Sequence, residues 1–205
     1  MDSLPSLPSE NKLLARLPIE ERERLAPYLK PVHLYFGQQL VEFDYPIEYV
    51  YFLGTAVTST IVQTPHGETL EVGIMGAEGF VGLSLLYGVE CSNGTVVVQV
   101  SGNALRMSAS DFLKHVKSKD GPCLDVLLRY ANFFQVMVQQ HAACNAAHKI
   151  EERMCRWILL TQDRTGNNGF ALARRTPRDC FDDRAHASAG GTHHLHTRAN
   201  ESARR

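Results

Sequence analysis

The pattern of apolar and polar residues changes its period along the chain. Between Val32 and Met107, apolar residues recur in short runs of period two, separated by Gly and Pro, which is typical of β-strands. These runs predict about seven or eight strands, and their punctuation favours a jelly roll or sandwich. The expected strands cover residues 32–36, 39–43, 48–53, 56–63, 69–75, 95–100 and 104–107.

A helical period replaces the strand pattern after Met107. Ser108 and Asp111 resemble a capping box and predict a short helix through Val116. Gly121-Pro122 then opens a long helix that is apolar on more than one side, so more than one side must be buried. One side is expected to lie on the sheet, and the other on the same helix of a second subunit. The residues assigned to this dimer contact are Leu124, Leu127, Leu128, Ala131, Phe134, Met137 and Val138.

Shorter helices are predicted near both ends of this pattern. Ser9 is expected to cap a helix that carries three leucines, and Pro18 suits the first turn of the next helix. A further helix is predicted over about 148–162, and the glycines at 166 and 169 mark a loop after it.

The folded pattern ends near Leu172. Residues 173–205 are rich in Arg, His, Ala and Asp, with too few apolar side chains to bury a face. The expected fold class is therefore α+β: an antiparallel β-roll, a long helix, a short helix and a disordered tail. The expected boundaries are a loose lead-in at 1–9, the β-roll with flanking helices at 10–120, the long helix at 121–147, a junction at 148–172 and the tail at 173–205.

Composition and charge exclude several classes of protein. The chain has 205 residues, a formal net charge of −1 and 44% hydrophobic residues, so no global field recruits nucleic acid or anionic membrane. Its five cysteines are odd in number and form no CxxC pair, which argues against a disulfide framework. We find no secretion signal and no apolar stretch of membrane-spanning length, so we expect a cytoplasmic protein without membrane association.

The sequence offers no motif for catalysis, and we expect that the protein is not an enzyme. His193, His194 and His196, with His186 upstream, suggest nitrogen ligands for a metal. Chance histidines in a loose tail are the favoured interpretation, because no cysteine or carboxylate stands beside them at a fixed ligand spacing. We therefore predict no metal site and no certain cofactor.

Three stretches, in this order along the chain, carry a resemblance to a known family. They are the turn and strand at Pro46–Phe52, the glycine-rich loop at Gly76–Gly82, and the helical segment from Cys144 to Arg164. With the helix pair before the strands and the long helix after them, this order resembles the Crp/Fnr family of bacterial transcription regulators. The resemblance covers roughly residues 10–172 and implies a cyclic-nucleotide-binding-like effector domain.

The resemblance also suggests where a small-molecule effector would bind. In family members that bind cyclic nucleotides, a Glu takes the ribose hydroxyls and an Arg takes the phosphate. Here Leu83 follows Gly82, and the second segment reads Cys91-Ser92-Asn93-Gly94-Thr95, so binding of cyclic AMP is expected to be weak or absent. The alternative is a β-turn in which glycines supply positive φ angles. The candidate ligand-binding residues are Gly76, Glu78, Gly79, Phe80, Val81, Gly82, Leu83, Asn93, Gly94 and Thr95.

The resemblance stops where a DNA-binding module would begin. The family continues into a winged helix-turn-helix, which needs about 60–70 further residues with helical periodicity. Residues 173–205 are fewer and lack that periodicity, which resembles translation in a shifted frame. We therefore expect a homodimeric Crp/Fnr-type regulator that lacks its recognition helix and has lost sequence-specific DNA binding. The alternative is a stand-alone ligand-binding protein, or a dominant-negative partner that forms heterodimers with a full-length relative.

Overall fold

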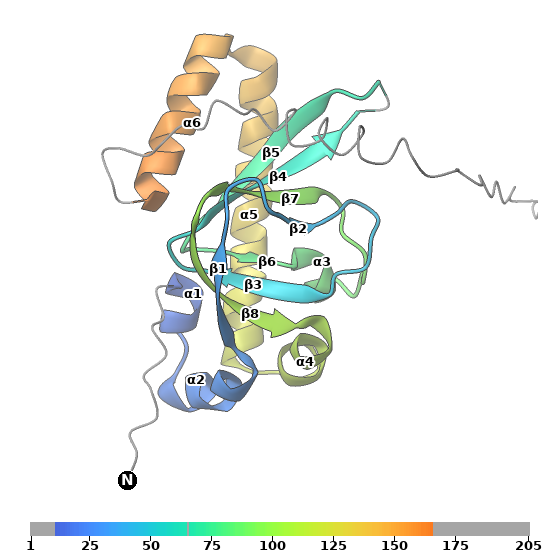
Figure 1. The fold of residues 1–205 in the computed structure, drawn as a ribbon, viewed down its shortest axis with the longest axis vertical. Coiled ribbons are helices and arrows are strands. Elements are labelled where there is room, and N and C mark those ends of the chain that lie inside the picture. Colours follow the sequence, from blue (N-terminus) through green and yellow to red (C-terminus); the bar gives the residue numbers. More distant parts are fainter. Residues whose placement is uncertain (1–10, 65, 166–205) are drawn as a thin grey trace, which may run out of the picture. The chain divides into compact units, whose positions relative to one another are not determined.

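The computed structural model describes residues 11–64 and 66–165, all within the unit Met1–Leu172. Its strands form two four-stranded antiparallel sheets, in the orders β1-β8-β3-β6 and β2-β7-β4-β5 (Figure 1). The strands are β1 (Lys30–Leu34), β2 (Gln39–Val41), β3 (Tyr49–Leu53), β4 (Val57–Gln63), β5 (Thr69–Met75), β6 (Phe80–Val81), β7 (Thr95–Val100) and β8 (Gly102–Ser108).

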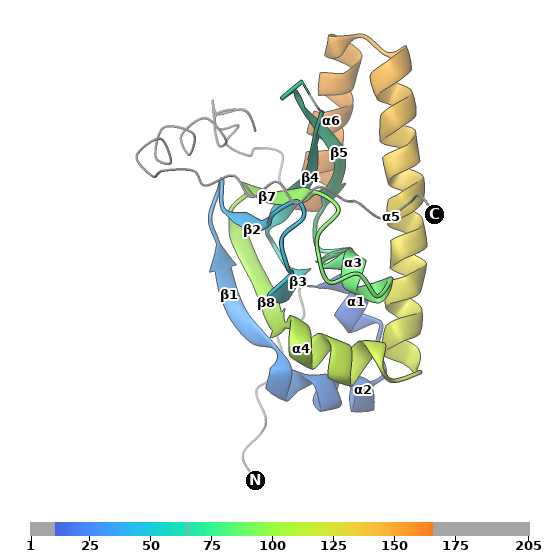
Figure 2. The same cartoon turned by 90° about the vertical axis from the view of Figure 1, so that its right-hand side faces the viewer.

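The helices lie at one end and along one side of this β-roll, and the longest of them runs along that side (Figure 2). The helix α6 folds back beside the C-terminal half of α5, in contact with β4 and β5. The helices are α1 (Lys12–Ala15), α2 (Ile19–Leu25), a 3₁₀ turn (Ala26–Tyr28), α3 (Leu83–Leu86), α4 (Ala109–Phe112), a π-helical turn (Leu113–Lys117), α5 (Pro122–Ala147) and α6 (Ile150–Thr165).

Aromatic side chains hold the centre of the main core. Phe80 is fully buried, and its ring lies 5.7 Å from the ring of Phe52 and 6.1 Å from that of Phe112. Tyr130 from α5 joins the same cluster, with 5.6 Å between its ring and that of Phe80. Aromatic pairs at these separations add to the stability that burial itself provides. The cluster therefore joins both strands of the β3–β6 pair to α4 and α5.

A second, smaller core forms where α5 and α6 meet the outer face of the second sheet. Val57, Ile74 and Met137 are buried there, with Phe134 and Leu160 packed against them. Strand β4 is therefore covered on both faces at its N-terminal end, which explains why Thr58 and Ser59 are as buried as Val57. In a sheet with one solvated face, buried and exposed side chains would alternate along the strand instead.

The structure confirms the predicted fold class of an α+β protein built on an antiparallel β-roll. Five of the predicted strands shift at one or both ends: β1 begins two residues earlier than predicted, and β8 extends beyond both predicted ends. The predicted cap at Ser108 is confirmed, because Ser108 Oγ accepts from the Asp111 amide at 3.0 Å; the Asp111 carboxylate accepts from the Ser108 hydroxyl at 2.6 Å, where a capping box would use the Ser108 backbone amide. Strand β6 and helix α3 were not predicted as separate elements. The prediction that Ser9 caps the first helix is wrong, because α1 begins at Lys12 and its N-cap is Asn11. The predicted lead-in and the tail at 173–205 lie outside the described residues.

Candidate functional site

The glycine-rich loop is a tight connection between β5 and α3 rather than an open loop. The Gly79 amide donates to the Gly76 carbonyl at 2.9 Å, and Gly82 adopts a φ of 116° just before α3 begins. That φ lies in the region that favours glycine, and a side chain there would also press on Val50. The glycine at 82 is therefore required by the turn itself, whatever else the loop does.

Two of the candidate ligand-binding residues belong to the core. Phe80 and Val81 form β6, pair with β3 and are buried. Their side chains are packed within the β-roll and cannot face a ligand in this conformation. Gly79 lies against the end of the Tyr130 side chain, so a side chain at position 79 would collide with the Tyr130 hydroxyl. Any ligand contact by this part of the loop would have to use backbone groups, and that contact stays a prediction.

The second candidate segment lies at the start of β7, in the other sheet. Thr95 is buried, and its hydroxyl accepts from the Phe43 amide at 3.2 Å. Gly94 lies against the Ile61 carbonyl, which leaves little room for a side chain. Asn93 is exposed, whereas Leu83 is half-buried at the start of α3. The candidate residues thus come from both sheets, and Glu78 is the only charged residue among them.

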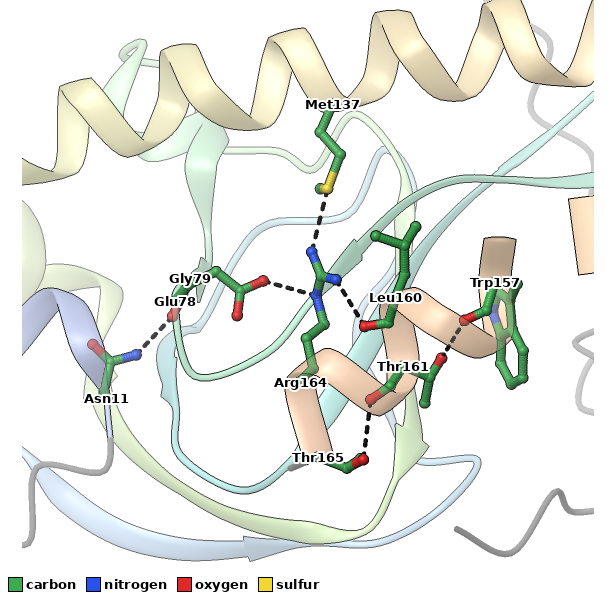
Figure 3. A network of polar contacts seen from close by, with 9 residues as sticks. All are labelled: Asn11, Glu78, Gly79, Met137, Trp157, Leu160, Thr161, Arg164 and Thr165. Atoms are coloured by element: carbon green, nitrogen blue, oxygen red, sulfur yellow. Dashed lines mark hydrogen bonds and ion pairs between the residues drawn. The ribbon is translucent and has the colours of Figure 1, made fainter. Parts of the chain in front are cut away.

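Glu78 is held by the far end of α6. Its carboxylate Oε1 lies 2.7 Å from Arg164 Nε, and the Arg164 side chain is only 8% exposed (Figure 3). Arg164 also donates to the Leu160 carbonyl at 2.9 Å and reaches the Met137 sulfur at 3.4 Å. Its aliphatic carbons cover Gly76, where a side chain would collide with them. Arg164 therefore connects the glycine-rich loop, α5 and α6.

Sequence reasoning placed Arg164 in a family-like stretch but gave it no role. A signal was present, because Arg164 continues the helical face that carries Trp157, Leu160 and Thr161. A charged residue on the inward face of a helix needs a partner of opposite charge. Glu78 could have been proposed as that partner only if α6 had been known to fold back on the loop.

A second polar contact joins α6 to the β-roll at Glu71 of β5. The Glu71 carboxylate accepts from the Ser59 hydroxyl and, at 3.3 Å, from the Trp157 indole nitrogen. Burial raises the pKa of Glu71 above its ordinary value, against the opposing effect of these two hydrogen bonds and of the Arg164 charge. The middle of α6 is thus attached to one residue of the sheet, Glu71, whose charge depends on its protonation.

Asn11 fixes the same loop from the opposite side. Its amide nitrogen donates to the carbonyls of Leu53 and Gly79, both at 2.8 Å. Its side-chain oxygen accepts from the amides of Leu13 and Leu14 and so caps α1. Asn11 is 2% exposed, so these bonds replace water completely. The residue that caps α1 therefore also connects α1 to β3 and to the glycine-rich loop by hydrogen bonds.

Most of the residues assigned to the dimer contact lie against the chain's own β-roll. Leu127, Ala131 and Met137 are buried within the chain, and Leu124, Phe134 and Val138 are half-buried. Phe134 and Val138 lie close to Gly73 of β5, which explains why this face of α5 is covered. Leu128 is 43% exposed and is the only member of the set that faces outward. The outward apolar residues of α5 are Leu128, Phe133 and Val136.

Between residues 11 and 165, position 65 apart, no group of three or more His, Cys, Asp or Glu could hold a metal ion. The histidines at 186 and 193–196 lie outside this range. Among the helices described, none has both the length and the apolar character needed to cross a membrane.

Comparison with known proteins identifies the fold. No protein-family model matches the chain, and a search of curated proteins found no significant match. Among solved structures, the c-di-GMP responsive global regulator CLP of Xanthomonas campestris is similar, with a TM-score of 0.56, 13% identity, and coverage of 89% of this chain and 96% of that one. Two regulatory subunits of a cAMP-independent protein kinase A are also similar, both at 19% identity and a TM-score of 0.51.

The two kinase subunits differ from this chain in length. The Trypanosoma brucei subunit matches over 58% of this chain and 43% of its own, and the Trypanosoma cruzi subunit, bound to guanosine, over 64% and 47%. This chain therefore spans less than half the length of these subunits. At these identities the similarity establishes the fold alone. The β-roll with its helices thus shares its fold with these regulatory proteins.

Proposed function

We propose that this chain is the effector-sensing and dimerisation part of a Crp/Fnr-type transcription regulator located in the cytoplasm. The ion pair between Glu78 and Arg164 is the observation that carries the proposal. It joins the glycine-rich loop to α6, and α6 is the helix that leads toward the DNA-binding domain in the family that the chain resembles. A contact of this kind lets a sensing loop control the position of an output helix.

The mechanism follows from the contacts of Arg164. A ligand that displaces the loop would move Glu78 and leave the Arg164 guanidinium buried without its counterion, which is costly unless α6 moves and lets water reach the guanidinium. Release of α6 would also remove the contact between Trp157 and Glu71. The loop and α6 thus have two joint arrangements, and a ligand that prefers one of them shifts the equilibrium.

Cyclic AMP is not the expected effector. Glu78 is the only charged member of the candidate ligand-binding set, and it is already paired with Arg164. Cys91 stands where the family resemblance places the phosphate-binding arginine, so a bound phosphate would lack its side-chain cation. Titration with cyclic AMP should leave the fluorescence of Trp157 unchanged. A saturable change at micromolar concentration would contradict this part of the proposal.

Sequence-specific DNA binding is proposed to be lost, because no recognition helix is expected in residues 173–205. A mobility-shift assay with the full chain at about 150 mM salt, where exposed charges are largely screened, should give no sequence-selective complex. Tight, selective binding would overturn this proposal. The frameshift itself is tested by translating the coding DNA beyond codon 172 in the other two frames. The hypothesis requires that one of them encode a helix-turn-helix-like segment.

The alternative is a dominant-negative partner of a full-length relative. The exposed apolar residues of α5 favour it, because the same face would bind a second copy or a relative. Sedimentation of this chain mixed with such a relative distinguishes the two functions. Heterodimers that bind DNA more weakly than the relative alone would support the alternative. No catalytic activity is proposed in either case.

A further inference from the structure

A cavity lies between α1 and α5, and Glu78 is the only one of the loop's candidate ligand residues in its lining. Its volume is about 510 Å³, within the range of about 300–1,000 Å³ typical of small-molecule sites. Helix α1 with its C-cap residue Arg16, and helix α5, supply all of its lining except Glu78. The lining residues are Lys12, Leu13, Arg16, Glu78, Val126, Arg129, Tyr130 and Phe133.

The wall of this cavity is apolar and aromatic. Leu13 and Tyr130 are buried, and Val126 is half-buried. The Phe133 ring is exposed and lies 6.3 Å from the Tyr130 ring at an angle of 38°. Two tilted rings beside aliphatic carbons form a surface that suits a planar or aliphatic group.

The rim carries an unbalanced positive charge. Lys12, Arg16 and Arg129 are exposed, and none forms an ion pair with another residue in the described part of the chain. The carboxylate of Glu78 does not offset them, because Arg164 already neutralises it at 2.7 Å. Three cations from two helices thus surround one apolar cavity.

A buried donor lies beside the cavity. The Tyr130 hydroxyl is buried against Gly79; the Phe80 backbone interacts with its oxygen, but its proton has no acceptor among the residues described. Burial, followed by the nearby Glu78 charge, raises the pKa of Tyr130, so the hydroxyl stays protonated at neutral pH. A buried hydroxyl whose proton has no acceptor is uncommon, and it lowers the stability of the folded state.

We propose that this cavity binds a small organic anion whose apolar body lies against Leu13, Tyr130 and Phe133. Its single carboxylate, sulfonate or phosphate group would be bound by Lys12, Arg16 and Arg129. A neutral molecule of the same shape would gain the apolar contacts but leave the cations unpaired. This site is independent of the proposed regulatory function, because it requires neither DNA binding nor the segment Asn93–Thr95.

Two fluorescent probes of nearly the same ring system test the proposal on the full-length chain. Anilinonaphthalene sulfonate carries one negative charge, whereas phenylnaphthylamine is neutral. We expect the sulfonate to bind with one site per chain and about tenfold or more tighter than the neutral probe, because charge-assisted contacts are formed only by the anion. In the double variant Arg16→Glu/Arg129→Glu this preference should disappear.

Further variants separate the cavity from general electrostatics and from unfolding. Lys114→Glu makes a charge reversal at an exposed position outside the cavity and should change the affinity for the sulfonate by less than about twofold. Phe133→Ala should weaken both probes, since it removes one aromatic wall. Thermal unfolding of each variant shows whether it is folded. We expect all of the variants to fold, because the substituted positions are exposed in the wild type. Equal affinity for the two probes, or equal losses in the double variant and Lys114→Glu, would overturn the proposal.

Discussion

At the scale of single residues, we expect Arg164 to contribute most to holding α6 on the β-roll. Its guanidinium contacts Glu78, the Leu160 carbonyl and the Met137 sulfur, and its carbons cover Gly76. No apolar residue could replace these contacts, because the Glu78 carboxylate would lose its cation. The side chain is nearly buried, so the ion pair is screened less than one on the surface.

Replacement of Arg164 by Ala should release α6. We expect a loss of about 1–3 kcal/mol in the free energy of unfolding, as for buried hydrogen bonds to charged groups. Trp157 is the only tryptophan of the chain, so its emission reports on α6 directly and should shift to longer wavelength. Arg153→Ala, on the same helix, is the matched control and should leave the emission unchanged. An unchanged spectrum in Arg164→Ala would mean that other contacts hold α6.

Asn11→Ala should destabilise the fold more than an ordinary cap substitution does. The side chain forms four hydrogen bonds, two to carbonyls of β3 and the loop and two to amides of α1. Removal of a cap costs about 1 kcal/mol, and the two carbonyls left without their donor raise the expected loss to about 2–3 kcal/mol. Denaturant unfolding measures it, with the exposed Asn132→Ala as the control. A loss no larger than that of the control would contradict the role of Asn11 as a tie.

These two residues show what the sequence could and could not predict. Capping by a polar residue near the start of α1 was predictable, but the sequence analysis assigned the cap to Ser9, whereas the structure assigns it to Asn11. Leu53 and Gly79 lie far from Asn11 in sequence, and only the fold brings them to its amide. The partner of Arg164 was unpredictable for the same reason. Long-range polar pairs leave no period in the sequence, whereas strands and helices do.

At the scale of elements, the period also explains which segments were missed. Strand β6 has two residues and α3 has four, too short to show a period of their own. The long helix α5 was predicted with its start at Pro122 because the apolar period continues over many turns. Its covered and outward sides could not be distinguished, since apolar residues occur on both. Its covered side became clear only from the close approach of Phe134 to Gly73.

That close approach predicts the effect of a single methyl group. A Cβ atom at residue 73 would lie 2.7 Å from Phe134 Cζ, so Gly73→Ala requires either the packed Phe134 ring or α5 itself to shift. Overpacking of this kind costs about 1–3 kcal/mol. Gly121→Ala is the control, because nothing lies within 4 Å of its added Cβ, and it should change stability by less than about 0.5 kcal/mol. Equal stability of the two variants would show that the ring moves aside freely.

The contact between α6 and β5 should depend on pH through Glu71. Burial raises the pKa of this carboxyl in the folded state, so the stability it contributes is fully present below its unfolded pKa. That contribution is lost as the pH rises through the folded pKa, because the buried acid must then ionise. Glu71→Gln keeps an acceptor but cannot ionise. It should therefore melt higher than the wild type near pH 8, and the difference should vanish near pH 4.

The measurement is the melting temperature of both proteins across this range, with Trp157 emission recorded in parallel. Glu68→Gln, in the neighbouring turn and exposed, controls for the loss of one negative charge. A wild type that is more stable than Glu71→Gln at high pH would show that the hydrogen bonds from Ser59 and Trp157 outweigh the cost of burial.

At the scale of the whole molecule, the outward side of α5 decides whether the chain acts alone. Leu128 is 43% exposed and Val136 is 55% exposed, and they lie eight residues apart on a helix. Positions four and eight apart share a face, so both can enter one interface with a second copy.

We predict a homodimer, and Leu128→Glu/Val136→Glu should convert it to monomers in sedimentation velocity runs. Leu70→Glu, at an exposed apolar position in β5, should leave the dimer intact. Because both substituted residues are exposed in the single chain, the monomers should keep the wild-type circular dichroism spectrum. A wild-type protein that sediments as a monomer at micromolar concentration would contradict this prediction. The contact of Arg164 with the loop would still exist, but there would be no dimer in which α6 could reposition two output domains.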